Sequence, residues 1–109
     1  FIKKIYNKYD YILVSVISPL LKTRKKAKKT FKKNYIEIYV KCNPKILKKR
    51  DTKGLYKLAK LNKLKHLIGF NSKISYEKSN YKVIMIDTGI LSISKSLLKI
   101  SNYIDNQNV

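Results

Sequence analysis

The sequence predicts a parallel α/β sheet flanked by helices. Three short runs of β-branched and apolar residues, at 11–17, 36–40 and 83–86, alternate with longer stretches whose apolar residues recur at helical spacing. Strands that alternate with helices favour parallel pairing through right-handed crossovers, with helices on both faces of the sheet. The 109 residues suffice for one domain or for part of one. Three strands are few for a complete sheet of this class.

The composition of each segment explains why a strand is predicted there. YILVSVI, at 11–17, is apolar almost throughout, which is typical of a strand buried on both faces, and Ser18-Pro19 ends it. IEIYV (36–40) and VIMI (83–86) are also β-branched, and Asp87-Thr88-Gly89 ends the second of them. The longest apolar run, 11–17, falls far below the roughly 20 residues that span a bilayer, so we expect no membrane segment.

Helices are expected before, between and after these strands. The predicted helices are 1–9, 22–33, 44–49, 54–62 and 92–103. The helix at 22–33 is basic with few apolar positions and reads as a surface helix. Asn43-Pro44 opens the third helix, because proline is tolerated in a first turn. Residues 63–80 lack clear periodicity and are expected to form a mobile connection.

The formal net charge of +20 comes from 26 basic and 6 acidic residues. Such a charge is typical of proteins that bind nucleic acid or an anionic membrane, and a small basic nucleic-acid-binding module is the alternative function that the sequence leaves open. Composition weakens this alternative, because 57 of the 109 residues are Lys, Ile, Asn or Tyr, whose codons are rich in A and T. Phosphate-binding surfaces also favour arginine, and only Arg24 and Arg50 occur.

The lone Cys42 excludes an internal disulfide and suits a reducing compartment, so a cytoplasmic location is expected. We interpret Cys42 as a packing residue. It follows the second predicted strand, and in parallel sheets ligands bind beyond the carboxyl ends of the strands. This rule singles out Ile17-Ser18-Pro19, Lys41-Cys42-Asn43 and Asp87-Thr88. The segment RDTKGLY (50–56) lies in the crossover between the second and third strands and is expected to fold over the same edge.

Several of these segments together resemble the C-terminal part of the adenylylsulfate kinase family. The matching succession is ISP at 17–19, Arg24 five residues after the proline, RDTKGLYKLAK at 50–60, Gly69, Tyr76-Glu77, and IDT at 86–88. The resemblance covers about residues 8 to 104. RD followed by KGLY at this distance from ISP is specific, whereas ISP or IDT alone carries little weight.

The resemblance implies a P-loop-kinase-like α/β fold whose N-terminal half, including the phosphate-binding loop, is missing here. Residues 1–109 then form a single partial domain with a lid region at about 50–75. The implied reaction moves the γ-phosphoryl group of ATP to the 3′-hydroxyl of adenosine 5′-phosphosulfate, with Mg²⁺ held by the missing half. A homodimer, or fusion or association with a sulfate adenylyltransferase, is also implied, with no specific nucleic acid as partner.

The resemblance also assigns residues. No catalytic residue and no metal ligand is expected in this chain. The expected substrate-binding residues are Ile17, Ser18, Pro19, Arg24, Lys53, Gly54, Leu55 and Leu67. The expected nucleotide and lid residues are Arg50, Asp51, Tyr56, Lys60 and Thr88. In this interpretation Arg24 approaches the phosphosulfate and Lys53 faces anionic oxygens when the lid closes.

Other interpretations stay open at these positions. Ser18 either belongs to the ligand loop or caps the turn before the helix at 22–33. Asp51 is expected to order its turn by pairing with Arg50 or a lysine, and Tyr56 to pack within the lid. Lys57 and Lys60 are expected to lie in water.

The departures from the family pattern concern catalysis. A phosphate-binding loop needs G-x-x-x-x-G-K-[ST], and Gly54, Gly69 and Gly89 are too far apart to supply it. Lys60 stands where the family has an arginine, and Leu67 replaces a phenylalanine that would offer a base-stacking surface. We therefore expect the 109-residue chain to be inactive by itself.

Overall fold

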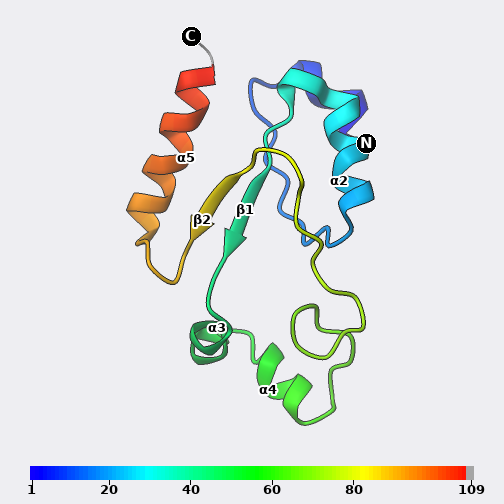
Figure 1. Cartoon of the computed structure of the whole chain (residues 1–109), viewed down its shortest axis with the longest axis vertical. Coiled ribbons are helices and arrows are strands. Elements are labelled where there is room, and N and C mark those ends of the chain that lie inside the picture. Colours follow the sequence, from blue (N-terminus) through cyan, green and yellow to red (C-terminus); the bar gives the residue numbers. More distant parts are fainter. Residues whose placement is uncertain (108–109) are drawn as a thin grey trace.

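The computed structural model describes residues 1–107 as a two-stranded parallel sheet with helices around it (Figure 1). The elements are α1 (Ile2–Ile5), the 3₁₀ turn η1 (Tyr6–Lys8), α2 (Leu21–Phe31), the 3₁₀ turn η2 (Lys32–Asn34), β1 (Ile38–Lys41), α3 (Pro44–Arg50), α4 (Leu55–Lys60), β2 (Ile84–Asp87) and α5 (Ile93–Gln107). The five predicted helices and two of the three predicted strands are confirmed. The connection at 63–80 contains no helix or strand, as its lack of periodicity indicated.

The sheet is parallel, with Ile38 opposite Ile84 and Lys41 opposite Asp87. Within β2, Ile84 and Ile86 are buried, whereas Met85 between them is 47% exposed. Because side chains alternate across a strand, β2 is buried on one face only. The face that carries Met85 is only partly covered in this chain, by Tyr76 stacked on the neighbouring Tyr39 of β1.

The strand predicted at 11–17 is also wrong. These residues belong to neither strand of the described sheet, and Leu13 is 88% and Val16 69% exposed. In Figure 1 the segment runs as an irregular trace from η1 to the start of α2. A buried strand needs a neighbour on each edge and a layer on each face, and in the described sheet β1 and β2 pair only with each other, so no strand lies beside residues 11–17.

Residues 44–72 form a lobe beyond the carboxyl ends of both strands, which we call the lower lobe (Figure 1). It contains α3, α4 and the first part of the irregular connection. Asn43 caps α3, since its side-chain oxygen accepts a hydrogen bond from the Lys45 amide at 2.9 Å. None of the helices within residues 1–107 is long and apolar enough to cross a membrane.

Candidate functional site

The carboxyl ends of β1 and β2 lie side by side and are tied together. The Thr88 amide donates to the Lys41 carbonyl at 2.9 Å, and Lys41 pairs with Asp87 at 3.2 Å. The Gly89 amide donates to the Asp87 carboxylate at 2.9 Å and is the main cause that lowers the pKa of Asp87, ahead of the opposing effect of burial and the help of Lys41. This edge of the sheet is thus an ordered turn.

Gly89 is required by a close approach at that turn. A Cβ at this position would lie 3.1 Å from the Asp87 carboxylate and 3.1 Å from the Ile46 Cδ1 of α3. It would also lie 3.4 Å from the Cys42 sulfur. The glycine therefore allows α3 to pack close to the end of β2.

Arg50 and Thr88, both predicted as nucleotide or lid residues, are brought together. One guanidinium nitrogen of Arg50 donates to the Thr88 carbonyl at 2.7 Å, and another lies 3.5 Å from the Thr88 hydroxyl. Arg50 is the last residue of α3 and Thr88 follows β2, so this contact joins the lower lobe to the sheet. Arg50 here connects two elements.

The RDTKGLY turn is built by Asp51 and Gly54. The two carboxylate oxygens of Asp51 accept hydrogen bonds from the amides of Tyr56 at 3.1 Å and Lys57 at 3.0 Å, in the first turn of α4. Gly54 has φ of +66°, a left-handed conformation that favours glycine. The prediction that Asp51 orders the turn is confirmed, but it does so by binding backbone amides that the start of a helix leaves free.

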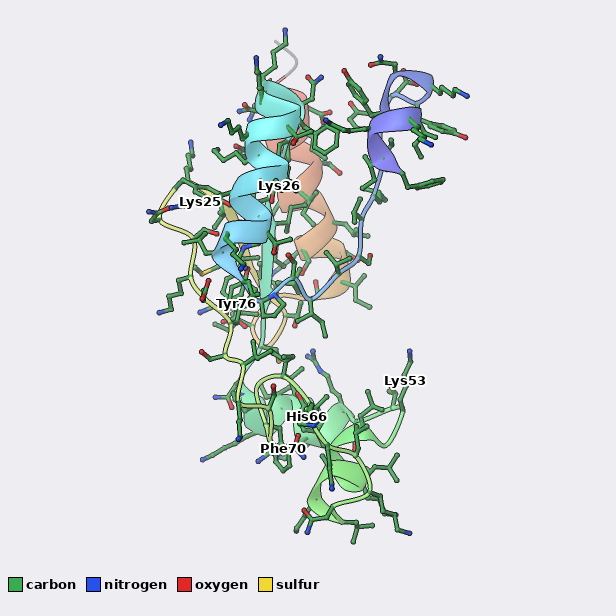
Figure 2. The ribbon with its side chains drawn as sticks, turned by 90° about the vertical axis from the view of Figure 1, so that its right-hand side faces the viewer. Lys25, Lys26, Lys53, His66, Phe70 and Tyr76 are labelled. Atoms are coloured by element: carbon green, nitrogen blue, oxygen red, sulfur yellow. The ribbon has the colours of Figure 1, made fainter. Side chains whose placement is uncertain are left out.

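Lys53 stands just before this turn and is exposed, as are Leu55, Lys57 and Lys60. Figure 2 shows Lys53 extending from the lower lobe. Tyr56 packs within the lobe, as predicted, with its ring edge-on to Phe70 at 5.9 Å between centroids. The half-buried Leu67 closes the same lobe through its carbonyl, which accepts from the Phe70 amide at 3.1 Å.

Phe70 is a residue that the sequence analysis did not select. The Lys48 ammonium lies 5.1 Å from its ring centroid, so the ring joins α3 to the loop after α4. Its position directly after Gly69 was the signal that could have identified it. The ring thus packs between Tyr56 of α4 and Lys48 of α3.

The loop at 17–19 is held by residues far away in the sequence. Ser18 has φ of +38°, and its carbonyl accepts from Arg24 at 2.5 Å. The Pro19 carbonyl accepts from the Glu77 amide at 2.9 Å, and the Leu21 amide donates to the Glu77 carboxylate. Of the two interpretations left open for Ser18, the side-chain cap is wrong, because Leu20 precedes α2 and the Glu77 carboxylate binds the Leu21 amide.

Arg24 is buried, with 5% of its surface exposed. Its guanidinium pairs with Glu37 at 3.2 Å, donates to the carbonyls of Ser18 and Glu77, and lies 3.4 Å from the Ser79 hydroxyl. Contact between Arg24 and a phosphosulfate stays a prediction. In the structure the guanidinium is directed into the protein.

The Arg24 guanidinium also stacks 4.4 Å from the centroid of Tyr76, which itself stacks on Tyr39 of β1 at 4.8 Å. Figure 2 places Tyr76 near the start of α2. The motif residues Tyr76 and Glu77 therefore pack against Arg24 and the 17–19 loop.

Glu37 is the carboxylate at the centre of this network and was not predicted. Its oxygens accept from the phenols of Tyr35 at 3.0 Å and Tyr81 at 2.5 Å, and from Ser79 at 2.5 Å. Burial alone raises the pKa of Glu37, but these hydrogen bonds and the charge of Arg24 outweigh it and leave the pKa lowered. Burial and the bond to Glu37 raise the pKa of Tyr35 and of Tyr81.

The structure thus brings the predicted residues into two groups. One joins 17–19 and Arg24 to Glu37 and Glu77, and the other joins Thr88, Arg50 and the lower lobe. Among residues 1–107 no three His, Cys, Asp or Glu side chains lie together as a metal site would require. Together the groups offer an ordered backbone loop and an exposed lysine, which suit an anionic substrate.

Comparison with known proteins agrees with this geometry. The family model described as adenylylsulphate kinase matches residues 2–87. The chain is 35% identical over 99 residues to the "Probable adenylyl-sulfate kinase" of Bacillus subtilis, covering 90% of this chain and 49% of that protein. It is 35% identical over 96 residues to the "Adenylyl-sulfate kinase" of Oceanobacillus iheyensis (87% of this chain and 47% of that protein) and 38% identical over 85 residues to that of Prochlorococcus marinus (77% and 41%).

These relatives are all about twice as long as this chain, which spans between 41 and 49% of them. No solved structure matches the chain significantly. Because the family model matches most of the chain and relatives above 30% identity cover up to nine tenths of it, the chain belongs to the adenylylsulphate kinase family.

Proposed function

We propose that residues 1–109 supply the C-terminal part of a domain that transfers the γ-phosphoryl group of ATP to the 3′-hydroxyl of adenosine 5′-phosphosulfate. The observation that carries the proposal is the RDTKGLY turn, in which Asp51 and Gly54 order the backbone and leave Lys53 exposed beyond the carboxyl ends of the strands. Membership of the family supports the assignment of ATP and adenosine 5′-phosphosulfate as substrates.

Phosphoryl transfer is catalysed mainly by positioning and by cations that face the oxygens on which charge accumulates. In the proposal the 17–19 loop offers backbone groups to the sulfonucleotide, and Lys53 neutralises phosphate or phosphosulfate oxygens when the lower lobe closes. Gly54, Leu55 and Leu67 line the closing lobe. Arg50 and Thr88 join the lobe to the sheet, and Asp51 and Tyr56 order the lobe itself. The exposed Lys60 is assigned to the lid by family resemblance.

The magnesium ion of the reaction does not fit the residues described here, since no cluster of carboxylates lies together among residues 1–107. No step of this chain is therefore derived through the ion. We assign its ligands, the phosphate-binding loop and the general base to the rest of the kinase domain. A cytoplasmic location, and a homodimer or association with a sulfate adenylyltransferase, belong to the same proposal.

The test uses the complete domain, by which we mean residues 1–109 joined to the remaining part of the domain from the natural polypeptide or from the Bacillus subtilis relative. An assay that couples ADP release to a change in absorbance should give turnover that depends on adenosine 5′-phosphosulfate. The 109-residue chain alone should give none, because it lacks G-x-x-x-x-G-K-[ST].

Two results would overturn the proposal. Turnover by the 109-residue chain alone would contradict the partial-domain assignment. A folded complete domain that neither binds adenosine 5′-phosphosulfate nor turns it over would contradict the activity. Nanomolar, sequence-selective RNA binding at physiological salt would instead favour the nucleic-acid-binding alternative.

A further inference from the structure

The charged pair Arg24–Glu37 is the most buried polar feature of the described chain. The Arg24 and Glu37 side chains are 6% and 7% exposed. No buried side-chain nitrogen or oxygen in the described part of the chain lacks a hydrogen-bond partner. A buried pair of this kind stays ionised only when further hydrogen bonds satisfy both partners, which is the case here.

Arg24 donates hydrogen bonds to the backbone of two segments, the predicted substrate loop at 17–19 and the segment that contains Glu77. It donates to the carbonyl of Ser18 in the 17–19 loop and to the carbonyl of Glu77, while Glu77 in turn holds the Pro19 carbonyl and the Leu21 amide. The guanidinium therefore binds two of these backbone groups directly, and through the Glu77 carbonyl it holds the segment that binds the other two. The φ of +38° at Ser18 is unfavourable for a residue other than glycine, so the loop needs this support to keep its form.

Glu37 in turn sets the position of Arg24. One of its oxygens accepts from Arg24 and Ser79, and the other accepts from Tyr35 and Tyr81. Three hydroxyl groups therefore hold the carboxylate in place in addition to its bond with Arg24. Glu37 precedes β1, so it links the loop to the sheet.

We propose that Glu37 is a positioning residue that acts through Arg24 on the 17–19 loop and so sets the affinity for the sulfonucleotide. This inference rests on the proposed function. The role of Arg24 is then indirect, because each nitrogen of its guanidinium already has a hydrogen-bond partner inside the protein. The affinity for ATP should not depend on Glu37.

The experiment compares Glu37→Gln with the matched control Tyr35→Phe in the complete domain. Glu37→Gln removes the charge that holds Arg24, whereas Tyr35→Phe removes a hydrogen bond only from the other carboxylate oxygen. Glu37→Gln should raise the KM and the Kd for adenosine 5′-phosphosulfate about tenfold or more and leave the KM for ATP and kcat within about twofold. Tyr35→Phe leaves Ser79 and Tyr81 bonded to the carboxylate, so it should lower the thermal midpoint with little change in the KM or the Kd for adenosine 5′-phosphosulfate.

A direct role of Arg24 in binding the substrate predicts a different effect of Glu37→Gln on affinity. If Arg24 bound the phosphosulfate directly, Glu37→Gln would free its charge, and the affinity for adenosine 5′-phosphosulfate would rise or stay the same. That result, in a domain that remains active, overturns the inference and leaves the proposed function intact. If the wild-type domain neither binds nor turns over the sulfonucleotide, the proposed function fails instead.

Two further measurements keep the inference testable in each case. Glu37→Asp retains the charge and should recover most of the affinity, which covers the case in which Glu37→Gln does not fold. Amide exchange at Leu21 and Glu77, which donate their hydrogen bonds at the loop, should speed up at least tenfold in Glu37→Gln and not in Tyr35→Phe. Unchanged exchange at both amides overturns the inference whether or not the domain is active.

Discussion

Lys53 and Lys57 are both exposed and lie four residues apart, yet the proposed function gives them different roles. In the complete domain, Lys53→Ala should lower kcat/KM about tenfold or more, since one charge-assisted contact in a closed site contributes about 1.5–3 kcal/mol. Lys57→Ala is the matched control and should be nearly silent. Steady-state kinetics of both variants check this. Equal effects, or none from Lys53→Ala, would show that the turn is scaffold.

The Glu37 network predicts how stability depends on pH. Because the pKa of Glu37 is lowered in the folded chain, its contribution is present above the ordinary carboxylate value of about 4.3 and is lost as pH falls further. The pKa values of Tyr35 and Tyr81 are raised, so their contribution is present below about 10 and is lost as pH rises above it. Urea unfolding of the complete domain should therefore show a plateau between these limits.

Two variants separate the loss of stability at low pH, the acid limb, from the loss of stability at high pH, the alkaline limb. Glu37→Gln should flatten the acid limb, leaving a smaller slope to which Asp87 contributes through its own lowered pKa. Tyr35→Phe should reduce the slope of the alkaline limb, to which Tyr81 still contributes, and leave the acid limb steep. An acid limb that is unchanged in Glu37→Gln would contradict the assignment of this carboxylate as a buried, charged group.

At the scale of elements, α4 depends on the turn that precedes it. Asp51→Ala removes both side-chain bonds to the first turn of α4 and should cost about 1 kcal/mol. Gly54→Ala places a side chain at φ of +66° and should cost about 1–2 kcal/mol. Faster amide exchange at Tyr56 and Lys57 should accompany both changes. The exposed neighbour Thr52→Ala is the control, and an equal effect there would contradict the capping role.

Elements were predictable from the sequence where their cause is local. Asn43-Pro44 capping α3 and the glycine turn before α4 are examples, because the residues that cause each structure lie within a few positions of it. The segment 11–17 has the composition of a strand, but a strand also needs partners, and those are set by the rest of the fold. Composition could not reveal that this segment lies outside the sheet that the two other strands form.

The candidate site was predictable only in part, for the same reason. The family model matches residues 2–87, which contain the motif segments, and the turn around Gly54 follows from its sequence. The binding roles of the individual residues stay predictions. Arg24 lies in a helix whose other basic residues are exposed, so nothing in its local pattern indicates burial. Glu37 pairs with Arg24 across 13 positions of sequence. Ser79 and Tyr81 donate to Glu37 from more than 40 positions away.

As a whole molecule the chain is open for its size. Its accessible surface is 9502 Å², whereas a compact protein of 12.8 kDa exposes about 6,300 Å². Its radius of gyration is 16.0 Å, against about 13 Å for a compact domain of this length. Large apolar side chains contribute to the excess, including Leu13, Val16, Ile90 and Ile93. Exposed apolar surface of this kind marks an interface, which agrees with the proposal that more of a kinase domain packs here.

The uncovered segment 11–17 also affects how this chain behaves at high concentration. A run of apolar, β-branched residues without proline or charge can stack between chains as cross-β fibrils when it is accessible. The net charge of +20 opposes such stacking, but its range shrinks from about 10 Å at 0.1 M salt to about 3 Å at 1 M. Adding salt to the isolated chain should therefore increase thioflavin T fluorescence, and Val14→Lys should suppress the increase. If Val14→Lys forms fibrils as readily, another segment is responsible. An increase in fluorescence on adding salt would mean that the charge of the abundant lysines acts as a gatekeeper against self-assembly.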